Sequence, residues 1–255
     1  MKEIVIDNNV FEISMEKTVK FRYLLLQKDG KNYFYKENIS DKFIYRHALN
    51  NEIYIVELLK NKSIPQIYAY QKDKYILYEY IDGISLNNFE YVSIKNTLLI
   101  TLNVIKVLRE LKGYGYVHCD IKRSNIMISQ DNKIYMVDFG SCTLEGEDIL
   151  FASINSSSPQ LLEDKVARFS SDIYSLGILM YEILSNQNLY TNLTMEEAII
   201  QKRNKLRDIK ELRNDVSDEL NYVIMKCINS TEGEKYTLDE LGSILYNLYN
   251  NIKNV

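Results

Sequence analysis

Cysteine, proline and long apolar runs are all scarce in this 255-residue chain, which has three cysteines and two prolines. Because Cys119, Cys142 and Cys227 lie far apart without metal-ligand spacing, we expect reduced thiols in a reducing compartment. The longest apolar stretch, residues 173–184, contains Glu182 and is shorter than the roughly 20 residues of a membrane helix. The N-terminal residues lack the apolar core of a signal peptide. These absences predict a cytoplasmic location and no membrane partner.

Positive charge is not in excess either. The chain has 31 Lys and Arg residues against 35 Asp and Glu residues, a formal net charge of −4. This balance argues against nucleic acid as the main partner. The 46% hydrophobic content is ordinary for a globular protein and is enough for a sizeable core. The length fits one large domain or two small lobes.

The pattern of apolar residues divides the chain into a β-rich part and a helical part. Four strands are expected, at residues 21–26, 32–36, 67–70 and 75–80. Helical spacing predicts one helix in this part, over residues 49–61. Asp82-Gly83 ends the alternation, and a long helix is expected at residues 94–111. Short strands follow at 126–128 and 133–137, and the chain beyond residue 170 is mostly helical in pattern.

Two short motifs carry the chemistry. Residues 118–125 are His-Cys-Asp-Ile-Lys-Arg-Ser-Asn, and residues 138–140 are Asp-Phe-Gly. Phosphoryl transfer needs a carboxylate that orients the attacking hydroxyl and oxygen ligands that hold Mg²⁺ on the phosphates. Asp120, Asn125 and Asp138 offer these oxygens. The alternative for each motif taken alone is a turn with local hydrogen bonds.

These motifs resemble the catalytic loop and the Asp-Phe-Gly segment of the eukaryotic-type protein kinase superfamily, in a divergent and bacterial form. The resemblance covers nearly the whole chain and implies one serine/threonine protein kinase domain over residues 1–255. It implies a bilobal α+β fold. A small antiparallel β lobe with one helix would occupy about residues 1–80, and a larger α-helical lobe about residues 85–255, with a hinge at about 79–84.

The resemblance also implies roles for the motif residues. Asp120 would be the catalytic base, and Lys122 would place a positive charge near the transferred phosphate. Asn125 and Asp138 would hold Mg²⁺. Lys122 stands two residues after Asp120, which is the serine/threonine pattern, and Ser153 falls where such kinases carry a bridging Thr.

Further nucleotide-binding residues follow from the same resemblance. Lys36, at the end of Tyr-Phe-Tyr-Lys, would contact the α- and β-phosphates of ATP, with Glu52 as its partner and Glu57 as the alternative partner. The competing interpretation of these charges is solvated surface. Backbone atoms of Glu79 and Ile81 would bind the adenine edge. The resemblance also implies that two side chains contact the base, with Tyr78 behind it and Met127 beneath it.

Downstream residues resemble the family as well. Ser158-Pro159-Gln160 stands where the family has Ala-Pro-Glu, and Asp172 begins an Asp-Ile-Tyr-Ser-Leu-Gly segment. In the family this Asp holds the backbone of the catalytic loop. The carboxylate of Ala-Pro-Glu normally pairs with a late Arg, which implies an amide–ammonium hydrogen bond between Gln160 and Lys235 here.

Two departures from the family put catalysis in question, and a third concerns regulation. No glycine precedes Gly30, so the glycine-rich phosphate loop is missing. Phe34 stands where the family has a small Ala over the adenine, and Phe21 replaces a Val, so aromatic rings should crowd the base. Cys119 replaces an Arg that pairs with a phosphorylated activation loop in regulated kinases, and residues 141–158 contain no basic side chain, so we expect no need for activation-loop phosphorylation.

Three functions are therefore weighed. The leading one is a serine/threonine protein kinase whose partners are Mg-ATP and a protein hydroxyl. The alternative is a pseudokinase that acts as a nucleotide-sensing or protein-binding module. A small-molecule kinase of related fold ranks last, because such enzymes generally lack Lys122 and the helix start at Asp172. The substrate, the regulation and the oligomeric state cannot be read from the sequence.

Overall fold

The computed structural model describes residues 2–253, which form two compact units. The first, here called the sheet unit, contains the residues up to 84 together with 127–140. The second, here called the helical unit, contains residues 85–126 and those from 141 onwards. The boundary drawn from the sequence placed residues 127–140 in the larger lobe, whereas they group with the sheet.

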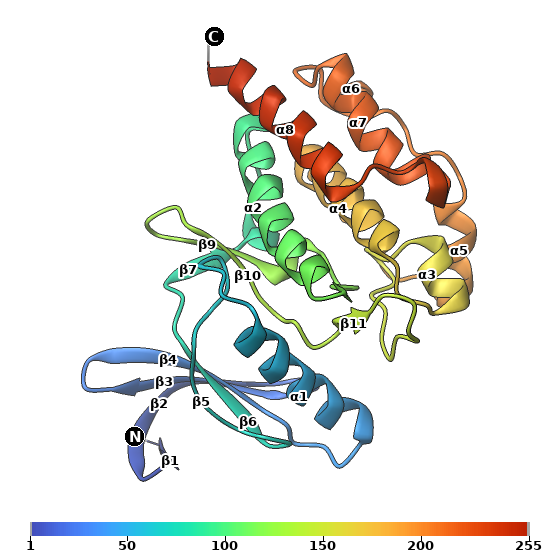
Figure 1. Cartoon of the computed structure of the whole chain (residues 1–255). Coiled ribbons are helices and arrows are strands. Elements are labelled where there is room, and N and C mark those ends of the chain that lie inside the picture. The colour runs from blue at the N-terminus through green and yellow to red at the C-terminus, as the bar shows by residue number, and fades with distance from the viewer. Residues whose placement is uncertain (1, 254–255) are drawn as a thin grey trace. The chain divides into compact units, whose positions relative to one another are not determined.

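The sheet unit contains a six-stranded antiparallel sheet in the order β1-β2-β3-β4-β6-β5 (Figure 1). The strands are β1 (Lys2–Ile6), β2 (Asn9–Thr18), β3 (Arg22–Lys28), β4 (Lys31–Glu37), β5 (Ile67–Gln71) and β6 (Tyr75–Glu79). Asp29 and Gly30 both have positive φ, which suits the tight turn between β3 and β4. Alternate residues of these strands, such as Leu24 and Leu26, are fully buried in an apolar core. The four strands expected here are confirmed.

The first hairpin of this sheet, β1 with β2, was not predicted. Its turn uses Asp7 and Asn8 in the left-handed region, and Ile6 and Phe11 are buried in the same core as Leu24. The signal was weak because apolar residues stand next to one another at 4–6 and 10–11 and do not alternate regularly, and Val10 is 52% exposed. The hairpin extends the sheet by two strands at one edge.

The helix of the sheet unit, α1 (Phe43–Leu58), begins six residues before the predicted start and ends three residues before the predicted end. Its first turn is largely exposed, with Phe43 67% exposed, so the apolar stripe begins only at Ala48. Leu59 is buried but extended, so the apolar pattern continues after the helix has ended. The stripe places Glu52 and Ile53 on the buried face.

A small second sheet has the order β10-β9-β7, formed by β7 (Gly83–Ser85), β9 (Ile126–Ser129) and β10 (Ile134–Met136). A Cβ at Gly83 would lie 2.5 Å from the carbonyl oxygen of Ile128, so only glycine allows this close approach of strands. Strands β9 and β10 were predicted, whereas β7 was expected only as a connector.

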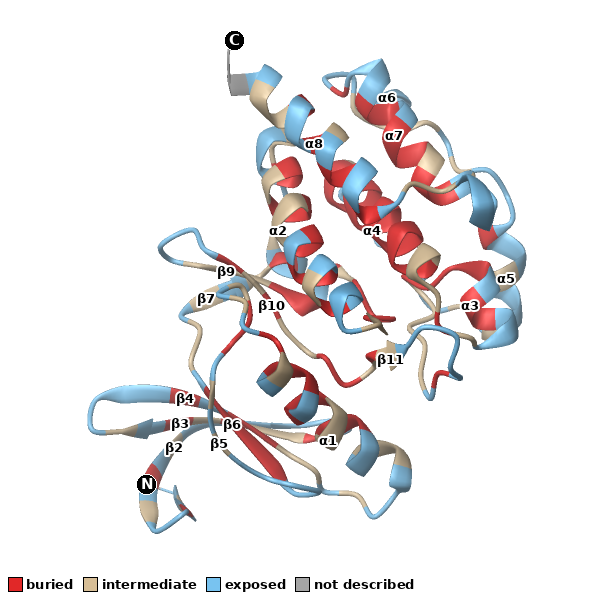
Figure 2. Ribbon diagram, viewed as in Figure 1, coloured by how far each residue is buried: buried red, intermediate tan, exposed pale blue. Residues whose placement is uncertain are grey.

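The helical unit is built around α4 (Phe169–Ser185), which is buried along nearly its whole length (Figure 2). The other helices are α2 (Ile94–Gly113), α3 (Pro159–Asp164), α5 (Met195–Lys202), α6 (Ile209–Leu212), α7 (Asp218–Asn229) and α8 (Leu238–Lys253). Helices α2 and α7 pack against α4, and α8 packs against α2. Ser158 caps α3 by accepting a hydrogen bond from the Leu161 amide, with Pro159 at the first helical position.

Short elements complete the helical unit. They are the strands β8 (Tyr116–Val117) and β11 (Thr143–Leu144) and the 3₁₀ helices η1 (Leu86–Asn88), η2 (Arg123–Asn125) and η3 (Glu232–Glu234). Strands β8 and β11 pair, so the segments before the catalytic loop and after Asp-Phe-Gly lie side by side. Within residues 2–253, no helix combines the length and apolarity of a membrane span.

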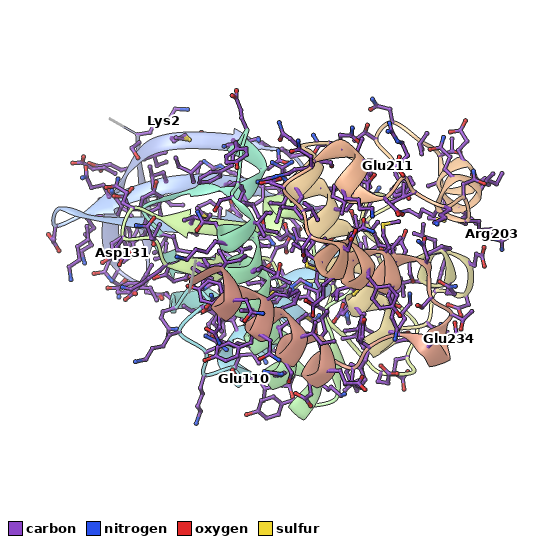
Figure 3. The ribbon with its side chains drawn as sticks, turned by 90° about the horizontal axis from the view of Figure 1, so that it is seen from above. Lys2, Glu110, Asp131, Arg203, Glu211 and Glu234 are labelled. Carbon is purple, nitrogen blue, oxygen red and sulfur yellow. The ribbon has the colours of Figure 1, made fainter. Side chains whose placement is uncertain are left out.

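Charged side chains lie at the surface of the helical unit, as the labelled Arg203, Glu211 and Glu234 show in Figure 3. Arg203 forms a 2.5 Å ion pair with Glu163, and Arg207 pairs with Glu211. Exposed pairs of this kind contribute little to stability. The charge-rich segment around residue 203 is therefore mostly a solvated surface.

Candidate functional site

The sheet unit joins Lys36 and Glu52, as the resemblance implied. Lys36 lies on β4 and Glu52 on α1, and the Lys36 Nζ donates to Glu52 Oε2 at 2.5 Å. Both residues are buried, 5% and 3% exposed. Burial alone lowers the pKa of Lys36, but the charges of Asp138 and Glu52 raise it above the ordinary value. The competing interpretation of Lys36 and Glu52 as solvated surface charges is therefore wrong.

Asp138 belongs to the same cluster. Its Oδ1 lies 3.2 Å from Lys36 Nζ, and its side chain is 44% exposed. Asp138 has a φ of 66°, so the chain turns sharply after β10 and directs the carboxylate towards Lys36. The next two residues are fastened to α1, because Asn51 Nδ2 donates to the Gly140 carbonyl at 3.1 Å. Lys36 thus bridges two carboxylates that are far apart in the sequence.

The second oxygen of Glu52 also has a donor. Tyr78, on β6, donates from its hydroxyl to Glu52 Oε1 at 2.8 Å. Tyr78 is 4% exposed, and burial raises the pKa of its hydroxyl well above the ordinary value. Glu57, the alternative partner for Lys36, is exposed and accepts from Tyr70 instead. The resemblance implied a place for Tyr78 behind the base and gave no sign of its bond to Glu52.

In the helical unit, the three residues of the catalytic loop converge. Lys122 Nζ donates to both carboxylate oxygens of Asp120, at 2.9 and 2.7 Å. Asn125 Nδ2 donates to the Asp120 carbonyl at 2.9 Å and to Asp120 Oδ2 at 3.0 Å. Asp120 and Asn125 are buried, whereas Lys122 is partly exposed. The loop therefore holds one carboxylate between a cation and an amide.

Asp172 holds the backbone of this loop. Its carboxylate accepts from the amides of His118 and Cys119, at 2.9 and 3.1 Å. Cys119 has a φ of 64°, an uncommon conformation for a residue with a side chain, and these two bonds stabilise it. His118 Nδ1 accepts from the amide of Asp120 at 3.2 Å, so His118 shapes the loop. The geometry agrees with the structural role that the resemblance gave to Asp172.

Aromatic rings surround Lys36 on its face of the sheet. Tyr23 lies opposite Lys36 in the β3–β4 ladder, and its ring stacks on Phe34 at 5.8 Å between centroids. Phe34 remains 37% exposed. Phe21 is buried, with Lys36 Nζ 4.7 Å from the centre of its ring. Tyr23 is thus an aromatic residue of this face that sequence reasoning missed, because the hairpin register could not be read from spacing alone.

The turn that replaces the glycine-rich loop is short. Thr18 pairs with Arg22, which leaves Val19, Lys20 and Phe21 between the strands. The amide of Val19 donates to the Phe21 carbonyl at 3.0 Å, which closes the turn. The Val19 amide is therefore bonded within the turn, whereas the amides of a glycine loop point towards phosphates. The two lysines at this turn, Lys17 and Lys20, are exposed to solvent.

The remaining nucleotide-binding candidates occupy the expected elements. Glu79 ends β6, and its amide donates to the Gln66 carbonyl at 3.0 Å. Ile81 follows in the connector, and Met127 is a half-buried residue of β9. Their roles towards adenine remain predictions, as does the role of Ser153.

The predicted hydrogen bond between Gln160 and Lys235 is not formed. Lys235 Nζ donates to the Cys227 carbonyl at 2.9 Å and lies 5.5 Å from the centre of the Tyr174 ring. Gln160 is exposed on α3. A carbonyl and an aromatic face satisfy a half-buried ammonium, so no amide partner is needed. Cys119, Cys142 and Cys227 are all buried, and none of the three forms a disulfide.

Each unit offers one oxygen of the kind that Mg²⁺ binds. Mg²⁺ usually takes one or two protein carboxylates and completes its shell with phosphate and water oxygens. Asp138 offers a partly exposed carboxylate beside an ammonium. The NH₂ group of Asn125 donates to Asp120, and its Oδ1 accepts from Ser124 Oγ at 3.3 Å, so Oδ1 is the atom through which Asn125 would hold the ion. Within residues 2–253, no larger group of carboxylates, histidines or cysteines could hold a metal ion.

Comparison with known proteins gives the family. The sequence model of the protein kinase domain family matches residues 24–246, nearly the whole chain. The chain therefore belongs to the protein kinase family, and the predicted α+β kinase fold is confirmed.

Relatives agree with this assignment. A probable serine/threonine-protein kinase of Clostridium acetobutylicum is 27% identical over 229 residues, which cover 82% of this chain and 35% of that protein. The probable serine/threonine-protein kinase PknB of Lactococcus lactis is 24% identical, over 69% of this chain and 30% of its own length. PknB of Mycolicibacterium smegmatis is 26% identical, over 64% and 28%. The chain thus spans about a third of the length of these relatives.

Proposed function

We propose that the chain is a serine/threonine protein kinase that transfers the γ-phosphate of Mg-ATP to a protein hydroxyl. The observation that carries this proposal is that each unit brings the side chains of its motif into direct contact. The sheet unit has Glu52, Lys36 and Asp138 linked in one cluster, and the helical unit has Lys122 and Asn125 on Asp120. Relatives whose names read serine/threonine-protein kinase, two of them with the word probable, support the same class of enzyme.

Each side chain has a role that follows from its surroundings. Magnesium, when bound, neutralises charge on the phosphates, and Asp138 and Asn125 are its proposed ligands. Lys36, fixed by Glu52, places an ammonium against the phosphates. Asp120 accepts the hydrogen bond of the attacking hydroxyl and so orients it. Lys122, already on Asp120, adds positive charge where the phosphoryl group moves.

Phosphate transfer to a general acceptor protein tests this function directly. The protein would be incubated with γ-radiolabelled ATP, Mg²⁺ and the acceptor, beside Asp120→Asn and a matched surface control, Asp131→Asn. We expect Asp120→Asn to lower transfer about 10²- to 10⁴-fold, as the loss of a positioned base does. Asp131 is exposed and pairs only locally with Lys133 and Ser129, so its variant should match the wild type. Hydrolysis of the labelled acceptor should release phosphoserine or phosphothreonine.

The second candidate is a pseudokinase, a nucleotide-sensing or protein-binding module. The stacked rings of Tyr23 and Phe34 and the closed turn at Val19 favour it, because they change both the base-facing and the phosphate-facing surfaces. A wild-type protein that transfers no more phosphate than Asp120→Asn, yet binds Mg-ATP in calorimetry, would establish this candidate in place of the first.

A further inference from the structure

We propose that Tyr78 is a positioning residue, which keeps the Glu52 carboxylate turned towards Lys36 and so holds α1 in the arrangement that phosphate binding needs. The proposal rests on the proposed function, in which Lys36 contacts the phosphates. It assigns to one buried hydroxyl the task of fixing the partner of that lysine.

The two oxygens of Glu52 are divided between two donors. Oε1 accepts from the Tyr78 hydroxyl at 2.8 Å, and Oε2 accepts from Lys36 Nζ at 2.5 Å. The three residues are 3–5% exposed, so water does not replace either donor. A carboxylate with one donor can rotate about its last bonds, whereas two donors from different directions fix its plane.

The two donors come from neighbouring strands. Phe34 faces Tyr78 across the β4–β6 ladder, and Lys36 faces Ile76. Alternate residues of a strand share a face, so Tyr78 and Ile76 stand beside Phe34 and Lys36 on the same face of the sheet. The ladder therefore sets the spacing between the hydroxyl and the ammonium, and Glu52 reaches both from α1.

Moving Glu52 away would leave the Tyr78 hydroxyl without its carboxylate. A buried hydroxyl that loses its partner costs free energy, as does a buried ammonium that loses one carboxylate. The same movement of α1 would also break the bond from Asn51, next to Glu52, to the Gly140 carbonyl at 3.1 Å. Helix α1 is thus fastened through adjacent residues to the sheet and to the segment that follows Asp138.

This fastening requires no phosphate. Cys119 and residues 141–158 offer no basic side chain that could pair with a phosphorylated loop. The donors that hold Glu52 are instead a tyrosine and a lysine of the sheet, both present in the unmodified chain. Tyr78 thus takes over, from within the sheet unit, a positioning task that loop phosphorylation performs in regulated kinases.

Tyr78→Phe removes the hydroxyl and keeps the ring. Tyr75→Phe is a matched control on the same strand, because the Tyr75 hydroxyl also donates to a carboxylate, Asp7 Oδ1 at 3.2 Å, and Tyr75 is also buried. In the nucleotide-free protein, hydrogen exchange of the α1 amides should become about tenfold faster in Tyr78→Phe. A change of this size is expected when one hydrogen bond to a charged group is lost. Tyr75→Phe should leave exchange in α1 unchanged.

Two further measurements separate positioning from general stability. The KM for ATP should rise about fivefold to tenfold in Tyr78→Phe and stay unchanged in Tyr75→Phe, at a temperature where both are folded. In a Glu52→Gln background, Tyr78→Phe should add little, because the two residues act through one contact. Additive effects of the two substitutions would show that Tyr78 acts by another route.

Equal α1 exchange in the wild type and in Tyr78→Phe would overturn the proposal, whether or not the protein transfers phosphate. Faster exchange in Tyr78→Phe combined with no phosphate transfer by the wild type would have a different meaning. The contact would then position Glu52 as proposed, and the proposed kinase activity would be the part that fails.

Discussion

The sheet unit and the helical unit both hold reactive carboxylates, but they hold them in different ways. In the sheet unit, Lys36, Glu52 and Asp138 come from three elements separated by as many as 102 residues, and their contacts join side chain to side chain. In the helical unit, Asp120 and Asn125 are five residues apart, and the Asp172 carboxylate accepts hydrogen bonds from two backbone amides between β8 and η2. The first arrangement therefore depends on how strands and helix pack, and the second on a short loop held by one distant anchor.

The largest expected difference between the units follows from removing one lysine in each. Lys36→Met leaves two carboxylates without their buried cation and should cost about 3–5 kcal/mol of unfolding free energy. Lys122→Met should cost less than about 1 kcal/mol, because the Lys122 side chain is 31% exposed and Asn125 still binds Asp120. Urea denaturation measures both, and phosphate transfer should fall in both variants. Equal stability losses would contradict the contrast between the units.

A smaller effect is expected at the anchor of the catalytic loop. Asp172→Ala leaves the buried amides of His118 and Cys119 without an acceptor, which should cost about 2 kcal/mol and lower phosphate transfer about tenfold. Asp172→Asn keeps one acceptor oxygen and should lose about half as much stability. Thermal unfolding and initial transfer rates are the measurements. If Asp172→Ala loses about 2 kcal/mol of stability but transfers phosphate at the wild-type rate, the anchor supports the fold and not the loop geometry.

Replacing Phe34 of the sheet unit should have a moderate effect, and this substitution should improve ATP binding. Phe34→Ala removes a ring that stacks on Tyr23 and stands beside Lys36 on its strand, so the KM for ATP should fall about threefold to tenfold, with about 1 kcal/mol lost in stability. Steady-state kinetics at varied ATP checks this. A higher KM would mean that the ring serves as a stacking surface for the base and does not crowd it.

The smallest effect at neutral pH concerns Lys202 of the helical unit, whose Nζ donates to the Asn155 carbonyl and lies 3.8 Å from the centre of the Tyr190 ring. Burial lowers its pKa from 10.5 to about 7, with Glu182 acting weakly in the opposite direction. Between these two values the unfolded chain binds more protons than the folded one, so this residue makes the free energy of unfolding rise with pH.

Lys202→Met should remove that rise. Urea denaturation at pH 7 and at pH 9.5 would show a smaller increase in stability for the variant than for the wild type, within the pH window set by the pKa shift. Lys205→Met, at an exposed lysine of the same segment, serves as the control and should keep the wild-type slope. Identical slopes in the Lys202→Met variant and the wild type would show that Lys202 stays charged in the fold.

Much of the fold could be read from local pattern. The strands β3 to β6 and the helix α2 lie within a few residues of their expected bounds, because alternation and helical spacing directly reflect burial on one face. The hairpin of β1 and β2 was missed because its apolar residues do not alternate regularly and several of them are exposed. The first turn of α1 was missed because it is largely exposed.

The candidate site divides in the same manner. Residue spacing alone was enough to propose that Asp120, Lys122 and Asn125 act together, since a short loop can hardly separate them. The bond between Tyr78 and Glu52 had no signal in the sequence, because the two residues are 26 positions apart and belong to different elements, β6 and α1. The hydrogen bond expected between Gln160 and Lys235 failed because a nearer carbonyl and ring were already in place for the ammonium.

The sequence by itself determined the family, the order of the elements and the local chemistry of the catalytic loop, because these depend on residues that are near one another in the chain. Only the tertiary structure decided which side chain faces Lys36, which residue shares Glu52 and which rings line their face of the sheet. These depend on strand register, and a shift of one residue in a strand moves every side chain to the other face.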